Sequence, residues 1–287
     1  MGVFRFSQFS VITERSALKL GTDAVLLGSA MTLPLPSDDT FAVKSSTSGN
    51  TLTPAFLPGP QCLDIGTGTG VIALMLAQRC PRARILGIDI DLPSCEEAAE
   101  NFARSPWPDR LTAAHLSLEQ LDTRLDVSYA RAATAEGEGC HQFDLIFSNP
   151  PYYDTSLLNP DSREAEARHS CSLSYRDILR FAARRLSPHG TLSLILPAQS
   201  ESELLRFAAS CGLNLFRIVR IRTTPKKPFR RIIAEFSLSP AAAQCPFEEQ
   251  FSLPSGLCQS PVQEELTLQD GKRRSRQYEE LTREFYL

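Results

Sequence analysis

The residues best suited to chemistry follow a short apolar run near the middle of the chain. In FDLIFSNPPYYD, residues 143–154, the sequence Asn149-Pro150-Pro151-Tyr152 comes directly after residues of β-strand character. Two consecutive prolines cannot donate to a sheet ladder, so the strand must end there. Open α/β sheets bind ligands at the carboxyl ends of their strands. We therefore interpret this turn as a candidate catalytic loop; a plain strand-ending turn with exposed tyrosines is the alternative.

The chemistry that this turn could perform is the activation of an amine. The Asn149 side-chain oxygen and the Pro150 carbonyl oxygen are two acceptors for the N–H groups of an exocyclic amine. Accepting both hydrogen bonds favours a pyramidal nitrogen over the planar one of the ground state. Pro151 stiffens the loop, and Tyr152 can stack on the face of a base. These four residues could thus bind an exocyclic amine and activate its nitrogen.

A second group of candidate residues is the glycine-rich sequence LDIGTGTG, residues 63–70. Gly66, Gly68 and Gly70 stand between an expected strand and an expected helix, where glycines let a ligand approach the backbone. Glycines also serve tight turns, so the loop alone is a weak signal. Asp89 strengthens it, because it ends the next expected strand about 20 residues later, where a ribose-binding carboxylate belongs.

Asp64 indicates which cofactor the loop would hold. The spacing is G-x-G-x-G, and a carboxylate precedes it, which is unfavourable beside the two phosphates of a dinucleotide. A carboxylate suits a positively charged ligand, such as the ammonium and sulfonium of S-adenosylmethionine. The alternative is a buried Asp64 that only caps the loop.

The elements that must position these residues alternate between strand and helix. Strands are expected at 61–66, 84–91, 111–121, 143–148, 190–197, 213–222 and 230–238, and helices at 71–79, 94–105, 174–186 and 202–212. This order predicts an α/β fold with a doubly wound, mostly parallel seven-stranded sheet and an antiparallel edge hairpin. We divide the chain into an N-terminal segment (1–60), a catalytic core (61–240) and a C-terminal extension (241–287), with loop-like insertions near 34–60 and 126–141.

Composition excludes several classes of protein. The chain has 287 residues, of which 42% are hydrophobic, and a net charge of −3. Its eight cysteines form no C-x-x-C pair and its four histidines are isolated, so no metal site is expected. No stretch approaches a membrane span or a signal peptide, and we expect a cytoplasmic protein without a membrane partner.

Basic residues gather in two short runs although the whole chain is acidic. Residues 217–231 hold seven basic residues and no acidic one, and Lys226, Lys227, Arg230 and Arg231 are the candidates for RNA contact. A second run lies at 272–274. Ordinary solvated surfaces often carry such runs, so each run indicates either contact with a polyanion or a solvated surface without a partner.

The motifs together resemble a known family. LDIGTGTG, GIDID and SNPPYY are similar to the motifs of class I S-adenosylmethionine-dependent methyltransferases, which have a Rossmann-like fold. Residues 4–29 and 278–287 resemble the opening and the ending of the bacterial tRNA1(Val) (adenine-37-N6)-methyltransferases. The resemblance covers most of the chain outside the two insertions.

This resemblance implies the function and the roles of individual residues. It implies methylation of the N6 of an adenine in tRNA, with S-adenosylmethionine as cofactor, tRNA as partner and no metal; we expect a monomer. Asn149, Pro150, Pro151 and Tyr152 would hold the base. The implied cofactor-binding residues are Lys19, Gly21, Thr22, Asp23, Asp64, Gly66, Gly68, Gly70, Asp89, Ser117 and Asn149. Ser117 stands where family members usually have an acidic residue at the cofactor's adenine, and Glu119 is the other candidate for that contact.

Two other functions remain open from the sequence. The first is methylation of another amino nitrogen, such as guanine N2 in rRNA or a release-factor glutamine; the chain lacks the room for the extra domains that such enzymes usually carry. The second is a non-catalytic RNA-binding module on a methyltransferase fold. Intact Asp64, Asp89 and Asn149 argue against it.

Overall fold

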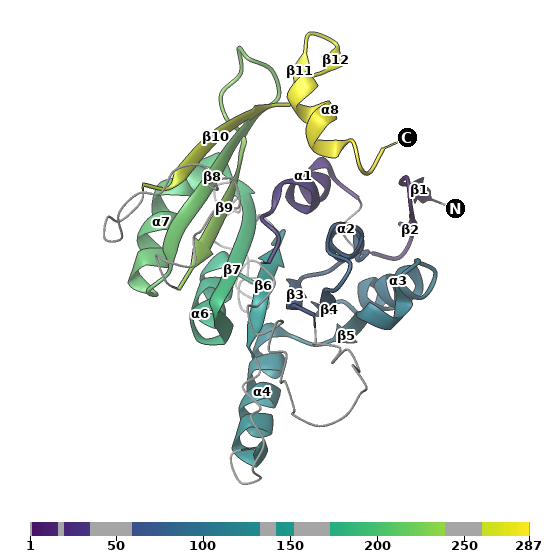
Figure 1. Ribbon diagram of the computed structural model, residues 1–287, viewed down its shortest axis with the longest axis vertical. Helices are drawn as coiled ribbons and strands as arrows, with labels where there is room; N and C mark the ends of the chain where they lie inside the picture. Colours follow the sequence, from purple (N-terminus) through teal and green to yellow (C-terminus); the bar gives the residue numbers. More distant parts are fainter. Residues whose placement is uncertain are drawn as a thin grey trace, which may run out of the picture.

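The fold is built on one large sheet (Figure 1). The computed structural model describes residues 2–16, 20–34, 59–132, 142–151, 173–238 and 260–286. Its main sheet has eight strands in the order β10-β8-β9-β7-β6-β3-β4-β5. The strands are β3 (Gln61–Ile65), β4 (Arg84–Asp89), β5 (Leu111–His115), β6 (Phe143–Ser148), β7 (Leu186–Pro197), β8 (Asn214–Arg222), β9 (Arg231–Ser237) and β10 (Val262–Thr267).

Strand direction decides where the functional loops lie. Only β9 runs antiparallel to its neighbours, β7 and β8, and every other neighbouring pair is parallel. The carboxyl ends of β3, β4, β5, β6, β7, β8 and β10 therefore share one edge of the sheet. The chain leaves β3 towards β4 and β5 and then returns to β6 on the other side of β3. This change of direction is where doubly wound sheets open a ligand crevice.

Helices cover both faces of the sheet, so two hydrophobic cores form (Figure 1). One face packs against α1 (Thr22–Ala30), α2 (Val71–Arg79), α3 (Leu92–Ala103) and α8 (Arg276–Thr282). The other packs against α4 (Leu118–Ala132), α6 (Tyr175–Arg185) and α7 (Glu201–Ser210). Short 3-10 turns lie at Pro108–Arg110 and Ala198–Ser200.

Helix α2 shows why the sequence folds in this way. Residues Val71 to Ala77 are all buried, because α2 is apolar around its whole circumference and lies between the sheet and α1. Seven consecutive buried residues, from Ala24 to Ala30, give α1 the same character. Fully burying one of the larger side chains, such as Leu74, contributes about 1.5–3 kcal/mol to folding.

The first and last described residues meet beside α2. Strands β1 (Val3–Arg5) and β2 (Ser10–Ile12) form a small antiparallel pair, and the Phe6 ring packs against the rings of Phe285 and Tyr286. The Ser7 N–H donates to the Phe285 carbonyl oxygen at 2.9 Å. The two terminal sequences that resemble the methyltransferase family thus form one structural unit.

The structure corrects three expectations. The sheet has eight strands instead of seven, because β10 from the C-terminal part pairs with β8 and replaces the expected hairpin as the sheet edge. Residues 111–121 are not one strand, since β5 ends at His115 and α4 begins at Leu118. That helix also runs to Ala132, inside the insertion expected at 126–141. The division at residues 60 and 240 stays a prediction, and residues 35–58 lie outside the described part.

Candidate functional site

The glycine loop joins β3 to α2 at the centre of the carboxyl edge. Gly66 and Gly68 have φ angles of 72° and 54°, a region that L side chains rarely adopt. A methyl group added to either would meet no atom closer than 3.6 Å, so the space beside them is open enough for a ligand. Gly70 differs, because a Cβ there would lie 2.4 Å from the Phe102 ring. Gly70 is therefore needed for packing against α3, and Gly66 and Gly68 form the ligand-facing part of the loop.

Asp64 lies directly beneath this loop and is 0% exposed. Its Oδ2 accepts a hydrogen bond from the Thr67 hydroxyl at 2.8 Å, whereas its Oδ1 has no hydrogen-bond partner among the described residues. Burial, with a smaller contribution from the charge of Asp89, raises the pKa of Asp64 to about 7, although the Thr67 hydroxyl and the Ala73 N–H act in the opposite direction. A buried carboxylate oxygen without a partner is costly for the folded protein, and a positively charged ligand group would relieve that cost.

Asp89, at the end of β4, holds the glycine loop from the side. Its Oδ2 accepts from the Gly68 N–H and its Oδ1 from the Asp91 N–H, both at 2.9 Å. A carboxylate can accept about four hydrogen bonds, so capacity for ligand hydroxyls remains. The neighbouring Ile90 and Leu92 are 55% and 47% exposed. They form an apolar surface next to a polar anchor, which the sequence analysis missed although the pattern Asp-Ile-Asp-Leu was visible.

Asn149 lies close to the glycine loop because β6, which it follows, pairs with β3. Ser148 is the register partner of Ile65, and its hydroxyl donates to the Ile65 carbonyl oxygen at 2.6 Å. Asn149 and Pro151 are half-buried and Pro150 is buried. The start of the Asn-Pro-Pro turn therefore lies beside Gly66 at the carboxyl edge of the sheet. Tyr152 lies outside the described residues.

The N-terminal segment is attached to the same loop by two buried side chains of α3. The Glu97 carboxylate, 0% exposed, accepts from the N–H groups of residues 14–16 at 2.5–2.9 Å. Asn101 bonds both backbone groups of Ile12 and the Thr69 carbonyl oxygen. Glu97 and Asn101 are polar residues on the apolar, buried face of α3. Polar residues at such positions in the helical pattern could have indicated buried hydrogen bonds from the sequence alone.

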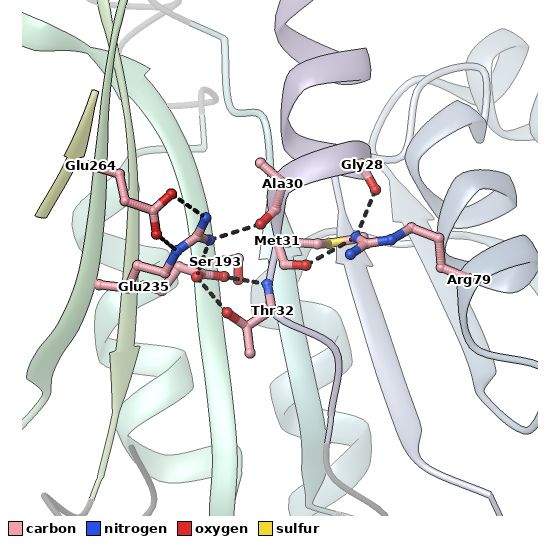
Figure 2. A network of polar contacts seen from close by, with 9 residues as sticks. Gly28, Ala30, Met31, Thr32, Arg79, Ser193, Glu235 and Glu264 are labelled. Atoms are coloured by element: carbon pink, nitrogen blue, oxygen red, sulfur yellow. Dashed lines mark hydrogen bonds and ion pairs between the residues drawn. The ribbon is translucent and has the colours of Figure 1, made fainter. Parts of the chain in front are cut away.

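Helix α1 is held at its carboxyl end by a buried polar network (Figure 2). Glu235 of β9, which is 0% exposed, accepts from the backbone N–H and the hydroxyl of Thr32 at 2.8 and 2.7 Å. Arg217 donates to Glu235 and to the Ala30 carbonyl oxygen, both at 2.8 Å. Arg79 donates to the carbonyl oxygens of residues 28 and 31. The end of α1 is therefore neutralised by two arginines, as the helix dipole favours.

The opposite end of α1 carries three predicted cofactor-binding residues. Gly21 is the N-cap, and Thr22 and Asp23 begin the helix. The Asp23 carboxylate accepts from Arg231 Nε at 2.7 Å, and Arg231 opens β9 at the carboxyl edge of the sheet. The two residues were assigned to cofactor and RNA from the sequence, and in the structure they form an ion pair. Lys19 lies outside the described residues.

Ser117 has a structural role that its sequence position did not suggest. Its hydroxyl accepts from the Gln120 N–H at 3.1 Å, and its own N–H donates to the Gln120 side chain at 3.0 Å. This reciprocal pair is a capping box, which begins α4. Whether Ser117 also contacts the cofactor stays a prediction.

Most basic residues of the run 217–231 have acidic partners. Arg217 pairs with Glu235 and Glu264, and these carboxylates raise its pKa although burial opposes the charge. The further ion pairs are Arg220 with Glu201, Arg222 with Glu265 and Arg231 with Asp23. The other three, Lys226, Lys227 and Arg230, are exposed in the turn between β8 and β9 and form no ion pair within the described part of the chain.

Known proteins of similar sequence identify the family. Residues 62–144 match the model of a methyltransferase domain. The tRNA1(Val) (adenine(37)-N6)-methyltransferase of Porphyromonas gingivalis is 38% identical over 234 residues, which are 82% of this chain and 80% of the relative. The proteins of that name from Bacteroides fragilis and Vibrio campbellii are 35% and 31% identical, covering 82% of this chain and 83% and 82% of the relatives. The chain belongs to this family.

The fold of this family member is also that of a solved methyltransferase. A predicted O-methyltransferase from Agrobacterium tumefaciens superposes with a TM-score of 0.55 at 16% identity, covering 92% of this chain and 96% of that one. At this identity the likeness shows the fold alone. In the described ranges, no helix is long and apolar enough to cross a membrane, and no three His, Cys, Asp or Glu side chains gather as metal ligands would.

Proposed function

We propose that this protein transfers a methyl group from S-adenosylmethionine to the exocyclic N6 of an adenine in tRNA, namely adenine 37 of tRNA1(Val). The observation that carries the proposal is the pairing of the ends of β6 and β3, with the Ser148–Ile65 hydrogen bond, because Asn149 and Gly66 are the next residues of the two strands. It brings amine acceptors next to a loop suited to a cationic cofactor. The names of the relatives support the substrate. Since tRNA is the substrate, we place the enzyme in the cytoplasm.

The described residues fit S-adenosylmethionine. The unpartnered Oδ1 of Asp64 would receive the ammonium of the methionine part, because a carboxylate in this environment is stabilised by a cation. Gly66 and Gly68 leave room for the cofactor against the backbone. Asp89 would bind the ribose hydroxyls, and the exposed Ile90 would cover one face of the adenine ring. When bound, the cofactor supplies an electrophilic methyl group on a positively charged sulfur.

The Asn-Pro-Pro turn would act on the target amine. The Asn149 side-chain oxygen and the Pro150 carbonyl oxygen accept its two N–H groups, which directs the nitrogen lone pair out of the ring plane and towards the methyl group. Pro150 has no N–H that could compete, and its ring fixes the direction of its carbonyl oxygen. Holding the two reactants in line supplies much of the rate, since transfer becomes effectively intramolecular. Tyr152 would stack on the target base after that base has left its stack in the anticodon loop.

The substrate backbone would contact the exposed cations of the β8–β9 turn. That turn shares the carboxyl edge with the glycine loop and Asn149, since β8 runs parallel to β6 and β3. Lys226, Lys227 and Arg230 are exposed there and available for phosphates. Arg231 is held by Asp23, so its contribution would be to orient α1.

A test of the proposal is methyl transfer from labelled S-adenosylmethionine to tRNA that lacks the modification, followed by nucleoside analysis. We expect label in N6-methyladenosine and in a single nucleotide of tRNA1(Val). Label in guanine N2 of rRNA or in a release-factor glutamine would show that the proposed substrate is wrong and that the proposed reaction, methylation of an amino nitrogen, is right. Absence of transfer together with absence of cofactor binding would leave a non-catalytic RNA-binding module as the function.

A further inference from the structure

A short hairpin in the C-terminal part presents a second group of cations beside the β8–β9 turn. Strands β11 (Gln269–Asp270) and β12 (Arg273–Arg274) are joined by Gly271 and Lys272. The Gln269 N–H donates to the Thr223 carbonyl oxygen at 2.8 Å, next to the pairing of β10 with β8. The hairpin therefore begins directly alongside the turn that carries Lys226, and both lie at the carboxyl edge of the sheet.

The hairpin is held rigidly on the body of the protein. Ser275 follows β12, donates through its N–H to the Leu268 carbonyl oxygen at 2.9 Å and caps α8 through its hydroxyl. The Arg274 guanidinium lies over the rings of Tyr278 and Tyr286, 5.8 and 4.5 Å from their centroids. Arg274 is thus used to fix the hairpin, and Lys272 and Arg273 remain as its exposed cations.

Charge in this region is strongly one-sided. Residues 223–230 hold three cations and no acid, and residues 268–276 hold four cations and one acid, Asp270, which is opposite Arg273 in the hairpin. Arg276 pairs with Glu280, so the excess of positive charge in the second segment comes from residues 272–274. Lys272 and Arg273 form no ion pair with any residue that the structure describes, whereas most arginines of β8 and β9 do. The whole chain carries a net charge of −3, so these two segments stand out against an acidic molecule.

We propose that Lys272 and Arg273 bind the phosphate backbone of the tRNA and, with the β8–β9 turn, form one continuous RNA-binding surface. This inference rests on the proposed function and adds a contact that is separate from the reacting base. Such a contact is needed physically, because taking a base out of its stack costs a few kcal/mol, which backbone contacts can offset. A rigid hairpin suits this role, since little side-chain and loop freedom is lost on binding.

The test compares two charge reversals of equal size. Lys272→Glu/Arg273→Glu changes the hairpin, and Arg84→Glu/Arg124→Glu changes exposed arginines of β4 and α4. We expect the hairpin variant to raise the KM for unmodified tRNA about five- to tenfold at moderate salt. The slope of log affinity against log salt should fall by about 1.4–1.8, the value for two lost phosphate contacts. The control variant should keep the wild-type KM and slope.

Two further readouts keep the result unambiguous. The hairpin variant should retain the affinity for S-adenosylmethionine, the melting temperature and the kcat at saturating tRNA, because neither residue touches the core or the cofactor site. An unchanged KM and salt slope in an active hairpin variant would overturn the inference and leave the proposed function intact. If the wild type itself transfers no methyl group to tRNA but binds it, loss of binding in the hairpin variant alone would still support the surface. If the wild type does not bind tRNA, the inference is wrong.

Discussion

Replacing Asp64 by asparagine should separate the stability of the folded protein from its cofactor affinity. The carboxyl keeps its proton up to about pH 7 in the folded chain but loses it near 3.8 when unfolded, so the folded state binds more protons between these values. The contribution of Asp64 to the stability of the folded state is therefore fully present below about pH 4 and is lost as the pH rises through 7. The shift corresponds to about 4 kcal/mol above pH 7, at about 1.4 kcal/mol per unit. The Asp64→Asn variant has no ionisable group at this position, so its free energy of unfolding should not fall in this way as the pH rises.

The predicted consequences have opposite signs for folding and for binding. We expect urea unfolding to show that the free energy of unfolding of the variant, relative to that of the wild type, increases by about 3 kcal/mol as the pH rises from 5 to 8. S-adenosylmethionine should bind the wild type about tenfold more weakly at pH 6 than at pH 8, because only about a tenth of Asp64 is ionised at the lower pH. The variant should bind roughly 10- to 100-fold more weakly at pH 8, with no pH dependence.

Titration calorimetry at pH 6.5 in two buffers of different ionisation enthalpy measures the proton that Asp64 releases on binding. Thr67→Val is the matched control. The Thr67 hydroxyl lowers the pKa of Asp64 through its hydrogen bond to Oδ2, so removing the hydroxyl should raise that pKa and move the midpoint of the pH dependence upward. A variant with unaltered cofactor affinity would refute the contact between Asp64 and the ammonium. A stability difference that does not change with pH would refute the buried, proton-linked state of Asp64.

Three other predictions concern the rest of the site. Asn149→Ala should lower kcat by about 10²–10³ with nearly unchanged cofactor affinity in equilibrium titrations; equal losses in both would exclude its role at the amine. Gly70→Ala should lower the melting temperature through the 2.4 Å clash with the Phe102 ring, whereas Gly68→Ala should act mainly on cofactor affinity; identical effects would contradict the division of the loop. Glu235→Gln removes the buried carboxylate from Arg217, which keeps only Glu264 as an ion-pair partner, and should reduce the free energy of unfolding by about 1–3 kcal/mol in urea titrations; an unchanged free energy would show that the network is not needed.

The parts of the fold that the sequence predicted are those with a strong local signal. The glycine loop, the strand before Asn149 and the helix at 174–186 each have uninterrupted patterns and clear terminating residues, and all three were located correctly. Helix α4 was missed because residues 116–119, Leu-Ser-Leu-Glu, alternate between apolar and polar in a way that also fits a strand. Its capping box, Ser117 with Gln120, was the signal to use.

Other features depended on contacts between distant residues and had no local signal. Strand β10 begins with four exposed residues, so its place beside β8 comes from pairing and not from a hydrophobic pattern. The Asp23–Arg231 ion pair joins residues 208 positions apart, and each residue had a plausible separate role in the sequence. Local motifs could identify the chemistry, whereas the charges that are satisfied within the protein became visible only in the structure.

The contact between Ser7 and residues 284 and 285 sets an order of assembly for the enzyme. During synthesis the sheet and the glycine loop leave the ribosome long before residue 284 exists. At about 5–20 residues per second, the opening segment waits roughly 15–60 s for its partner. Until then, residues 2–16 lack their contacts with residues 284–286 and keep their hydrogen bonds to Glu97 and Asn101 of α3. The nascent protein should therefore complete the support of its glycine loop late, after residues 284–286 have docked.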